Sequence, residues 1–129
     1  MGLDQYAFIK KPRAAKMAIG KVVEEREDVF YWRKHNRLQG WMEELYRRKG
    51  GREEFNCVDV ELTLEDIDQL EAAVLNKNLP ETGGFFFGND SYSDYEDEEY
   101  GYKNDDLSFI NKAKEILSND NKLYYSCWW

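Results

Sequence analysis

A change from strand to helix lies within residues 31–48, which have the sequence YWRKHNRLQGWMEELYRR. Four of residues 29–33, namely Val29, Phe30, Tyr31 and Trp32, are β-branched or aromatic, which predicts a strand over 29–33. From Asn36 onward, apolar residues recur at helical spacing to about Lys49, where two glycines follow. We therefore expect a strand that leads directly into a helix, and Asn36 is of the residue type that caps such a helix.

The two ends of this expected helix differ in how well they suit positive charge. Its apolar stripe predicts a face that packs on the core, and Arg47 and Arg48 lie at the C-terminal end, where the helix dipole favours cations. Cations also gather at the N-terminal end, where the dipole disfavours them. An anion held by the helix N-terminus and these side chains would compensate for that misfit. The cationic residues at this end are Arg33, Lys34, His35 and Arg37.

The rest of the chain predicts an α+β fold in a single compact domain over residues 1–129. Strands are expected at residues 3–10, 55–62 and 122–129, and helices at 63–76 and 104–117. Thr63 begins a capping-box-like Thr-Leu-Glu-Asp, and Asn104 is the expected cap of the last helix. The elements lack the regular crossovers of a parallel sheet, which favours a mixed or antiparallel sheet with about three helices.

Charge is distributed unevenly along the 129 residues. Residues 1–52 carry 13 Lys and Arg against 7 Asp and Glu, whereas residues 53–129 carry 5 against 19, for a net charge of −8. Such asymmetry predicts an anion-binding half or a head-to-tail contact between subunits, although the halves can also neutralise each other within one fold. The acidic balance makes nucleic acid an unexpected partner.

The composition also limits the class of protein. Two cysteines are too few for a disulfide framework or a zinc site, and no apolar run approaches the length of a membrane helix. No signal peptide is expected from the N-terminal residues. These features predict a cytoplasmic protein without a metal, a cofactor or a membrane contact.

Residues 89–103 form an acidic segment with six acids and four tyrosines. Nothing in it suits a core, so we expect a mobile surface loop or a segment that contacts another protein. A calcium loop is not expected, because Tyr95 occupies the position of the required glycine.

Two aromatic groups are candidates for contacts outside the core. Neighbouring residues in a strand point to opposite faces, so at least one ring of each group cannot lie on the core side. Such a ring can stack on a nucleobase or be buried between subunits. The groups are Phe85, Phe86 and Phe87, bracketed by glycines in a predicted strand or tight turn, and Trp128 and Trp129 at the end of the chain.

Six motifs together resemble a group of small tailed-phage proteins, and they span nearly the whole chain. Members often bear the label phosphoglycerate kinase, but this chain is far shorter than that two-domain enzyme and has no matching nucleotide motif. The resemblance implies a phage accessory protein in the cytoplasm of a bacterial host. The motifs are MGLDQY (1–6), YWRKHN-x-L-x-GWME (31–43), NCV (56–58), ELT-x-ED (61–66), LP-x-TGGFFFG (79–88) and Y-x-SCWW (124–129).

The sequence leads first to a non-catalytic protein that binds and sequesters a small anionic, nucleotide-type host signal, as counter-defence sponges do. A homo-oligomer completed through Trp128 and Trp129 is expected. One alternative is an acidic inhibitor that contacts a host protein through residues 89–103. Another is a small nucleotide phosphodiesterase that uses His35, although no nucleophile motif accompanies this histidine. The expected ligand-binding residues are Trp32, Arg33, Lys34, His35, Arg37, Phe85, Phe86 and Phe87.

Overall fold

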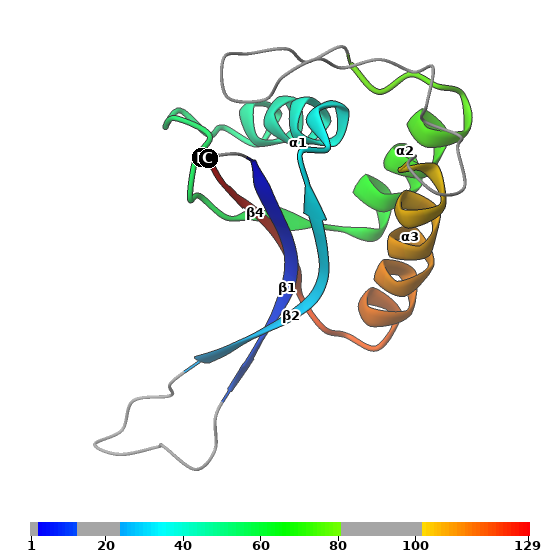
Figure 1. Cartoon of the computed structure of the whole chain (residues 1–129). Coiled ribbons are helices and arrows are strands. Elements are labelled where there is room, and N and C mark those ends of the chain that lie inside the picture. The colour runs from blue at the N-terminus through cyan, green and yellow to red at the C-terminus, as the bar shows by residue number, and fades with distance from the viewer. Residues whose placement is uncertain (1–2, 13–23, 81–101) are drawn as a thin grey trace.

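The structure, a computed structural model, describes residues 3–12, 24–80 and 102–129. Its described part contains four strands and three helices, which confirms the α+β class. Figure 1 shows these elements along the chain. In chain order they are β1 (Asp4–Pro12), β2 (Glu24–Arg33), α1 (Asn36–Arg48), β3 (Val60–Leu62), α2 (Leu64–Leu75), α3 (Lys103–Ser118) and β4 (Leu123–Trp128).

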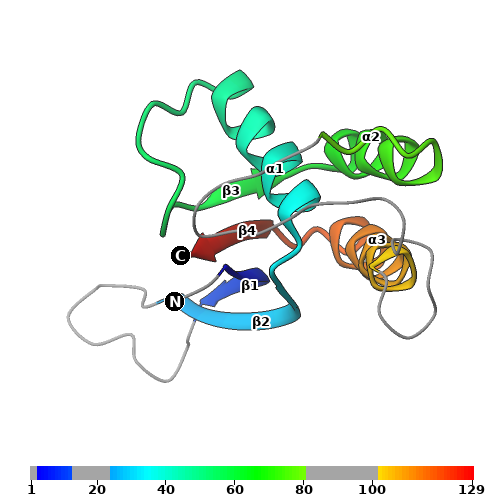
Figure 2. The ribbon, with the colours of Figure 1, turned by 45° about the horizontal axis from the view of Figure 1, so that its top comes forward.

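The strands form one antiparallel sheet in the order β2-β1-β4-β3 (Figure 2). The two ends of the described chain meet in its centre, because β1 pairs with β4. At one end of the sheet, Asp4 lies opposite Arg33 on β2 and opposite Trp128 on β4. A bulge between Ala7 and Phe8 shifts the register of the β1–β2 pair. The register at the end of the sheet therefore places three residues that are distant in sequence, Arg33, Asp4 and Trp128, in one row across β2, β1 and β4.

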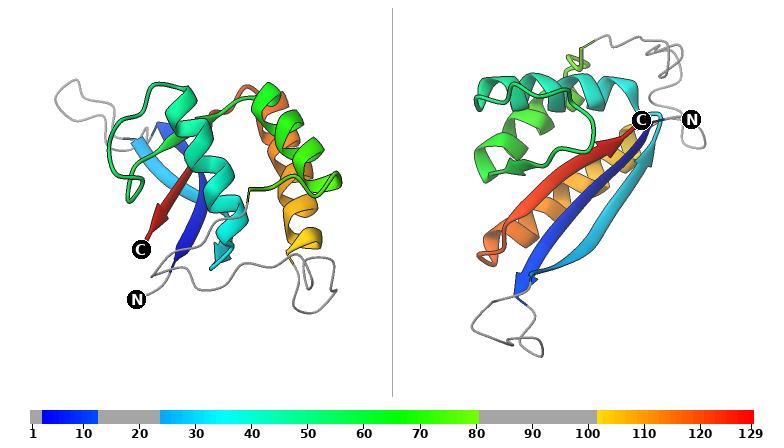
Figure 3. Two further views of the ribbon diagram at one scale, coloured as in Figure 1. Left: turned by 90° about the horizontal axis from the view of Figure 1, so that it is seen from above. Right: turned by 90° about the vertical axis from the view of Figure 1, so that its left-hand side faces the viewer.

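All three described helices lie on one side of the sheet, and the opposite side carries none of them (Figure 3). The alternation along β1 agrees with this arrangement, since Leu3, Gln5 and Ala7 are fully buried beneath the helices. On β4, Leu123, Tyr125 and Cys127 point into the same core. The other side of the sheet is called the open face below.

The predicted stripe of α1 does pack on the core. Leu38, Trp41, Met42 and Leu45 are buried, and Tyr46 packs partly buried against Phe55. Arg47 and Arg48 lie in the last turn of α1, as expected. The amphipathic pattern was therefore a correct guide to what this helix buries.

Helix ends and two strands differ from expectation, and β2 begins at Glu24 instead of at residue 29. Asn36 is the first residue of α1 rather than its cap; His35 holds the cap position without a side-chain cap bond. The cap of α3 is Tyr102, not Asn104, because the helix begins at Lys103. The third strand covers only Val60–Leu62 instead of residues 55–62.

The short third strand has a physical reason. Before Val60, the backbone bonds to the end of the chain instead of continuing a ladder: the indole of Trp129 donates to the Phe55 carbonyl at 2.8 Å. The Asn56 side chain also brackets Trp129, donating to its carbonyl and accepting from its N–H. These side-chain bonds, with one backbone bond from the Cys57 N–H to the Cys127 carbonyl, take the place of a regular strand ladder here.

Helix α2 follows the predicted pattern closely. Thr63 and Asp66 form a reciprocal capping box at its start. No helix within residues 3–12, 24–80 and 102–129 has the length and apolar character needed to cross a membrane. The Phe85–Phe87 group and all but the end of the acidic 89–103 segment lie outside the described residues.

Candidate ligand-binding face

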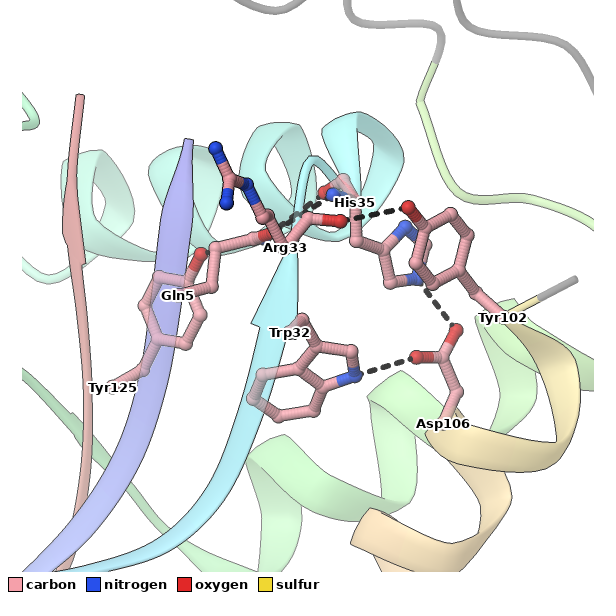
Figure 4. A network of polar contacts seen from close by, with 7 residues as sticks. All are labelled: Gln5, Trp32, Arg33, His35, Tyr102, Asp106 and Tyr125. Carbon is pink, nitrogen blue, oxygen red and sulfur yellow. Dashed lines mark hydrogen bonds and ion pairs between the residues drawn. The ribbon is translucent and has the colours of Figure 1, made fainter. Parts of the chain in front are cut away.

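His35, the only histidine, is buried at the junction of β2 and α1 (Figure 4). Its Nε2 lies 2.8 Å from Asp106 Oδ2 on α3, and its ring stacks on Tyr102 with centroids 4.2 Å apart and planes 7° apart. Its backbone N–H donates to Gln5 Oε1, and its carbonyl accepts from Gln5 Nε2. Contacts on the side chain and on both backbone groups hold this residue in place.

Trp32 belongs to the same cluster. Its indole N–H donates to Asp106 Oδ1 at 3.2 Å, and its ring meets Phe109 edge-on. Asp106 therefore contacts both Trp32 and His35, one through each carboxylate oxygen (Figure 4). The Tyr102 hydroxyl closes the cluster from the other side by donating to the Arg33 carbonyl at 2.7 Å.

This polar cluster continues on the helix side of the sheet through a chain of side chains that hydrogen-bond to one another. Gln5 Nε2 also donates to the Tyr125 hydroxyl, which donates to Gln39 Oε1. Gln39 Nε2 in turn contacts the Cys127 sulfur at 3.1 Å. Burial raises the pKa of Tyr125 well above its usual range, so this hydroxyl stays a neutral donor. Such a satisfied network specifies one packing of β1, α1 and β4.

The structure gives Trp32 and His35 structural positions rather than the ligand-contacting ones predicted from sequence. Each side chain is only 2 % exposed. Arg37 is partly buried and donates to the Leu79 carbonyl at 2.9 Å, which ties α1 to the chain beyond α2. The sequence places these cations together at the helix N-terminus, but the fold separates their side chains into buried, partly buried and exposed positions.

Among the members of the predicted set that the structure describes, Arg33 and Lys34 face solvent. The Arg33 side chain is 60 % exposed and its Nε lies 3.9 Å from Asp4 Oδ1. Lys34 is exposed in a left-handed backbone conformation with φ of 56°. The remaining predicted residues, Phe85, Phe86 and Phe87, lie outside the described part of the chain.

Arg33 belongs to the open face, where aromatic rings and charges gather. Two of the large exposed side chains are here: Tyr31 at 50 % and Trp128 at 63 % exposure. Strand alternation and register assign the face. Its strand residues are Asp4, Tyr6, Phe8, Lys10, Arg26, Asp28, Tyr31, Arg33, Glu61, Tyr124, Ser126 and Trp128.

Cations cover the rings at one end of the open face. The Arg26 guanidinium lies 3.9 Å from the Phe8 ring centroid and 5.3 Å from that of Tyr6. Lys10 lies 4.4 Å from the Tyr124 centroid. Phe8, although it points away from the helices, is therefore buried.

A depression of about 430 Å³ crosses the middle of the open face. Tyr6, Arg26 and Asp28 border one side, and Cys57, Asp59 and Trp128 border the other, with Ser126 and Cys127 between them. The lining joins two aromatic rings to carboxylates, a hydroxyl and a guanidinium. That combination suits a flat polar molecule with hydrogen-bonding edges.

The charges around the depression are paired. Arg26 Nε lies 2.7 Å from Asp28 Oδ1, and Lys10 Nζ lies 3.1 Å from Asp59 Oδ2. At the end of the face, Tyr31 donates to Asp4 at 2.6 Å, and this hydrogen bond raises the pKa of the Tyr31 phenol. Arg33 is the most exposed of these basic partners, at 60 %.

The two terminal tryptophans, predicted as an interface pair, lie in different environments. Trp129 is partly buried and held by Phe55 and Asn56, as described above. Trp128 points to the open face. The alternation argument for adjacent aromatic residues therefore identified a ring outside the core, and the oligomer stays a prediction.

The two cysteines also separate by face. Cys57 is exposed at the rim of the depression, whereas Cys127 is buried. Burial raises the pKa of Cys127 to about 11, despite hydrogen bonds from Gln39 and the Cys57 backbone. Cys57 is the accessible thiol of the pair.

Sequence reasoning missed most of the residues that line the depression. Tyr6, Ser126 and Trp128 alternate with core residues in β1 and β4, so that signal was present in the sequence. Asp28 and Asp59 carried no such signal, because only the strand order brings them to opposite sides of one depression.

Comparisons with protein-family models, with curated proteins and with solved structures find no match to this chain.

Proposed function

We propose that this protein is a non-catalytic binding protein that captures a nucleotide-type ligand on the open face of its sheet. The observation that carries the proposal is the row Arg33–Asp4–Trp128, in which an exposed guanidinium and an exposed indole lie at one end of the face. The depression begins at Trp128 and extends along the same face.

A base would lie in the depression, against Trp128 and Tyr6. Stacking of a base on an aromatic side chain contributes about 1–3 kcal/mol and needs only a flat exposed ring. Trp128 offers such a ring, since its side chain is largely exposed. The carboxylates and the Ser126 hydroxyl border the same space and can meet the polar edge of the base.

The phosphate would lie at Arg33 and Lys34. Arg33 and Trp128 are separated by two strand spacings, about 10 Å between backbones, a gap that a nucleoside monophosphate bridges when both side chains reach toward it. Arg33 can present two N–H groups to a phosphate, and exposed Lys34 adds a second charge beside it. These two residues retain the anion-binding role predicted from the sequence.

Capture without chemistry agrees with the position of His35. This histidine lies in the buried cluster with Asp106 and Tyr102, on the helix side of the sheet, whereas the depression lies on the other side. A general base must reach the proton it removes. The resemblance to small tailed-phage proteins supports the further proposal that capture sequesters a host signal in an infected bacterium.

Isothermal titration with a panel of cyclic and linear mononucleotides tests this proposal. We expect W128A to weaken binding by at least tenfold through lost stacking, and R33Q/K34Q to weaken it similarly through lost phosphate contacts. The matched control is R48Q/R52Q, which removes the same charge from two exposed positions, the last residue of α1 and a residue shortly after it. The ligand should return intact after heat denaturation.

Two results would overturn the proposal. Absence of binding for every nucleotide at millimolar concentration would remove its basis. Equal affinity for the wild type and W128A would remove the open face as the site. Recovery of a cleaved ligand would instead support the phosphodiesterase hypothesis. All variants alter exposed side chains, so their melting temperatures should stay close to that of the wild type.

A further inference from the structure

We propose that the depression selects a nucleobase with an exocyclic amino group, and guanine above the others. This inference rests on the proposed function and names the ligand class within it. It follows from the charges in the lining, where two carboxylates, Asp28 and Asp59, face one guanidinium, Arg26.

The carboxylates are the strongest polar groups that a ligand would meet there. Arg26 is already engaged, because its Nε donates to Asp28 and its plane lies over the Phe8 ring. Asp59 bonds to Lys10 through Oδ2 only. An ionised carboxylate accepts about four hydrogen bonds and donates none, so both groups retain acceptor capacity toward the depression. The site therefore favours a ligand edge rich in N–H donors.

Nucleobases differ sharply in that property. Guanine presents a ring N–H beside an amino group, and adenine and cytosine present an amino group. Uracil presents two carbonyl oxygens around a single ring N–H, and hypoxanthine presents a single ring N–H beside one carbonyl oxygen and no amino group. A carbonyl oxygen placed against a carboxylate meets an acceptor without a proton to share, which is unfavourable. The lining thus ranks bases by the donors on their edges.

The two carboxylates lie on opposite sides of the depression. Asp28 lies on β2 and Asp59 just before β3, at opposite borders of the depression, with Tyr6 and Trp128 as the rings. A base stacked on a ring can therefore direct its donor edge to either border. Both orientations select an amino group, and neither requires movement of the buried cluster around His35.

Titration calorimetry with GMP and IMP, which differ only in the 2-amino group of the base, tests the inference. Because the 2-amino group can donate a hydrogen bond to a charged carboxylate, we expect the wild type to bind GMP at least about tenfold more tightly than IMP. D59N should reduce the ratio of the GMP affinity to the IMP affinity, because an amide offers a neutral acceptor in place of a carboxylate. D28N provides the same test at the other border.

The matched control is E61Q, which removes one exposed carboxylate from the same side of the sheet but outside the depression. It should leave the ratio unchanged. Equal, measurable affinities of the wild type for GMP and IMP would overturn the base preference while leaving the proposed function intact. Absence of binding by either nucleotide, and by the rest of the panel, would overturn both.

Discussion

At the scale of the residue, neighbouring positions in a strand differ in whether the side chain is held within the fold or exposed to solvent. Trp129 is bonded to Phe55 and Asn56, whereas its neighbour Trp128 exposes its ring on the open face. The same holds at the junction of β2 and α1, where Arg33 faces solvent and Trp32 packs inside. Only the exposed member of each pair, Trp128 or Arg33, has a side chain that a ligand can reach.

The buried pair of His35 and Asp106 gives a stability prediction. H35A removes one hydrogen-bond partner of the buried Asp106, so we expect a loss of about 1–3 kcal/mol of unfolding free energy. Urea denaturation followed by tryptophan fluorescence measures it. R48A, at an exposed position in α1, is the control and should change stability by less than about 0.5 kcal/mol. A similar, small effect of H35A would contradict the structural role of this histidine.

The two thiols should react at very different rates. Cys57 is exposed, whereas Cys127 is buried with a pKa raised by burial to about 11, so it holds little thiolate at neutral pH. Iodoacetamide at pH 8 should modify Cys57 alone in the folded protein, and both after denaturation. Mass spectrometry of the digested protein reads out each site. Equal labelling of both in the folded state would refute this placement.

At the scale of the element, the capping box of α2 links stability to pH. Burial acts to raise the pKa of Asp66, but hydrogen bonds from Lys49 and Thr63 outweigh it and leave the pKa below its usual value. A carboxylate with a lowered folded-state pKa stabilises the fold above its unfolded pKa of about 3.9, and this contribution is lost as pH falls through the folded value.

D66N should therefore be less stable than the wild type near pH 7, and the difference should shrink as the pH falls below about 4. Thermal melts across pH 3–7 measure it. T63A removes the other half of the box and should cost about 1 kcal/mol. A constant difference between D66N and the wild type at every pH would contradict the assignment.

The elements also show which parts of the fold the sequence predicts and where it stops. Periodicity found α1 and α2, and the Thr63 box found the start of α2, because these signals are local. The predicted third strand is longer than the observed one. Phe55 and Asn56 bond instead to Trp129, which lies 73 or more positions later in the chain. The depression was missed for the same reason, since β1 and β4 come from opposite ends of the described chain.

At the scale of the whole molecule, charge limits the ligand. The chain carries a net charge of −8, and most cations of the open face are paired with carboxylates. A polyanion would be repelled by this net negative charge, and nucleic-acid binding depends on many phosphate contacts. Under the proposed function, a single phosphate at Arg33 and Lys34 would avoid this cost.

A single-stranded oligonucleotide should accordingly bind no more tightly than a mononucleotide of the same base. Fluorescence anisotropy at 50 mM and 200 mM salt measures this, and the mononucleotide affinity should fall only modestly between the two. A steep loss of oligonucleotide affinity with salt, from a tight starting value, would indicate several phosphate contacts and would contradict the single-nucleotide site.

The most direct test of the open face as the binding site uses the rim thiol as a local reporter. The alkylation rate of Cys57 is measured by mass spectrometry with and without saturating GMP, and compared with the rate for W128A under the same conditions. Because Cys57 borders the depression beside Trp128, bound ligand should slow its alkylation severalfold in the wild type and much less in W128A. An unchanged Cys57 rate, under conditions where calorimetry shows GMP bound, would place the ligand elsewhere and contradict the account.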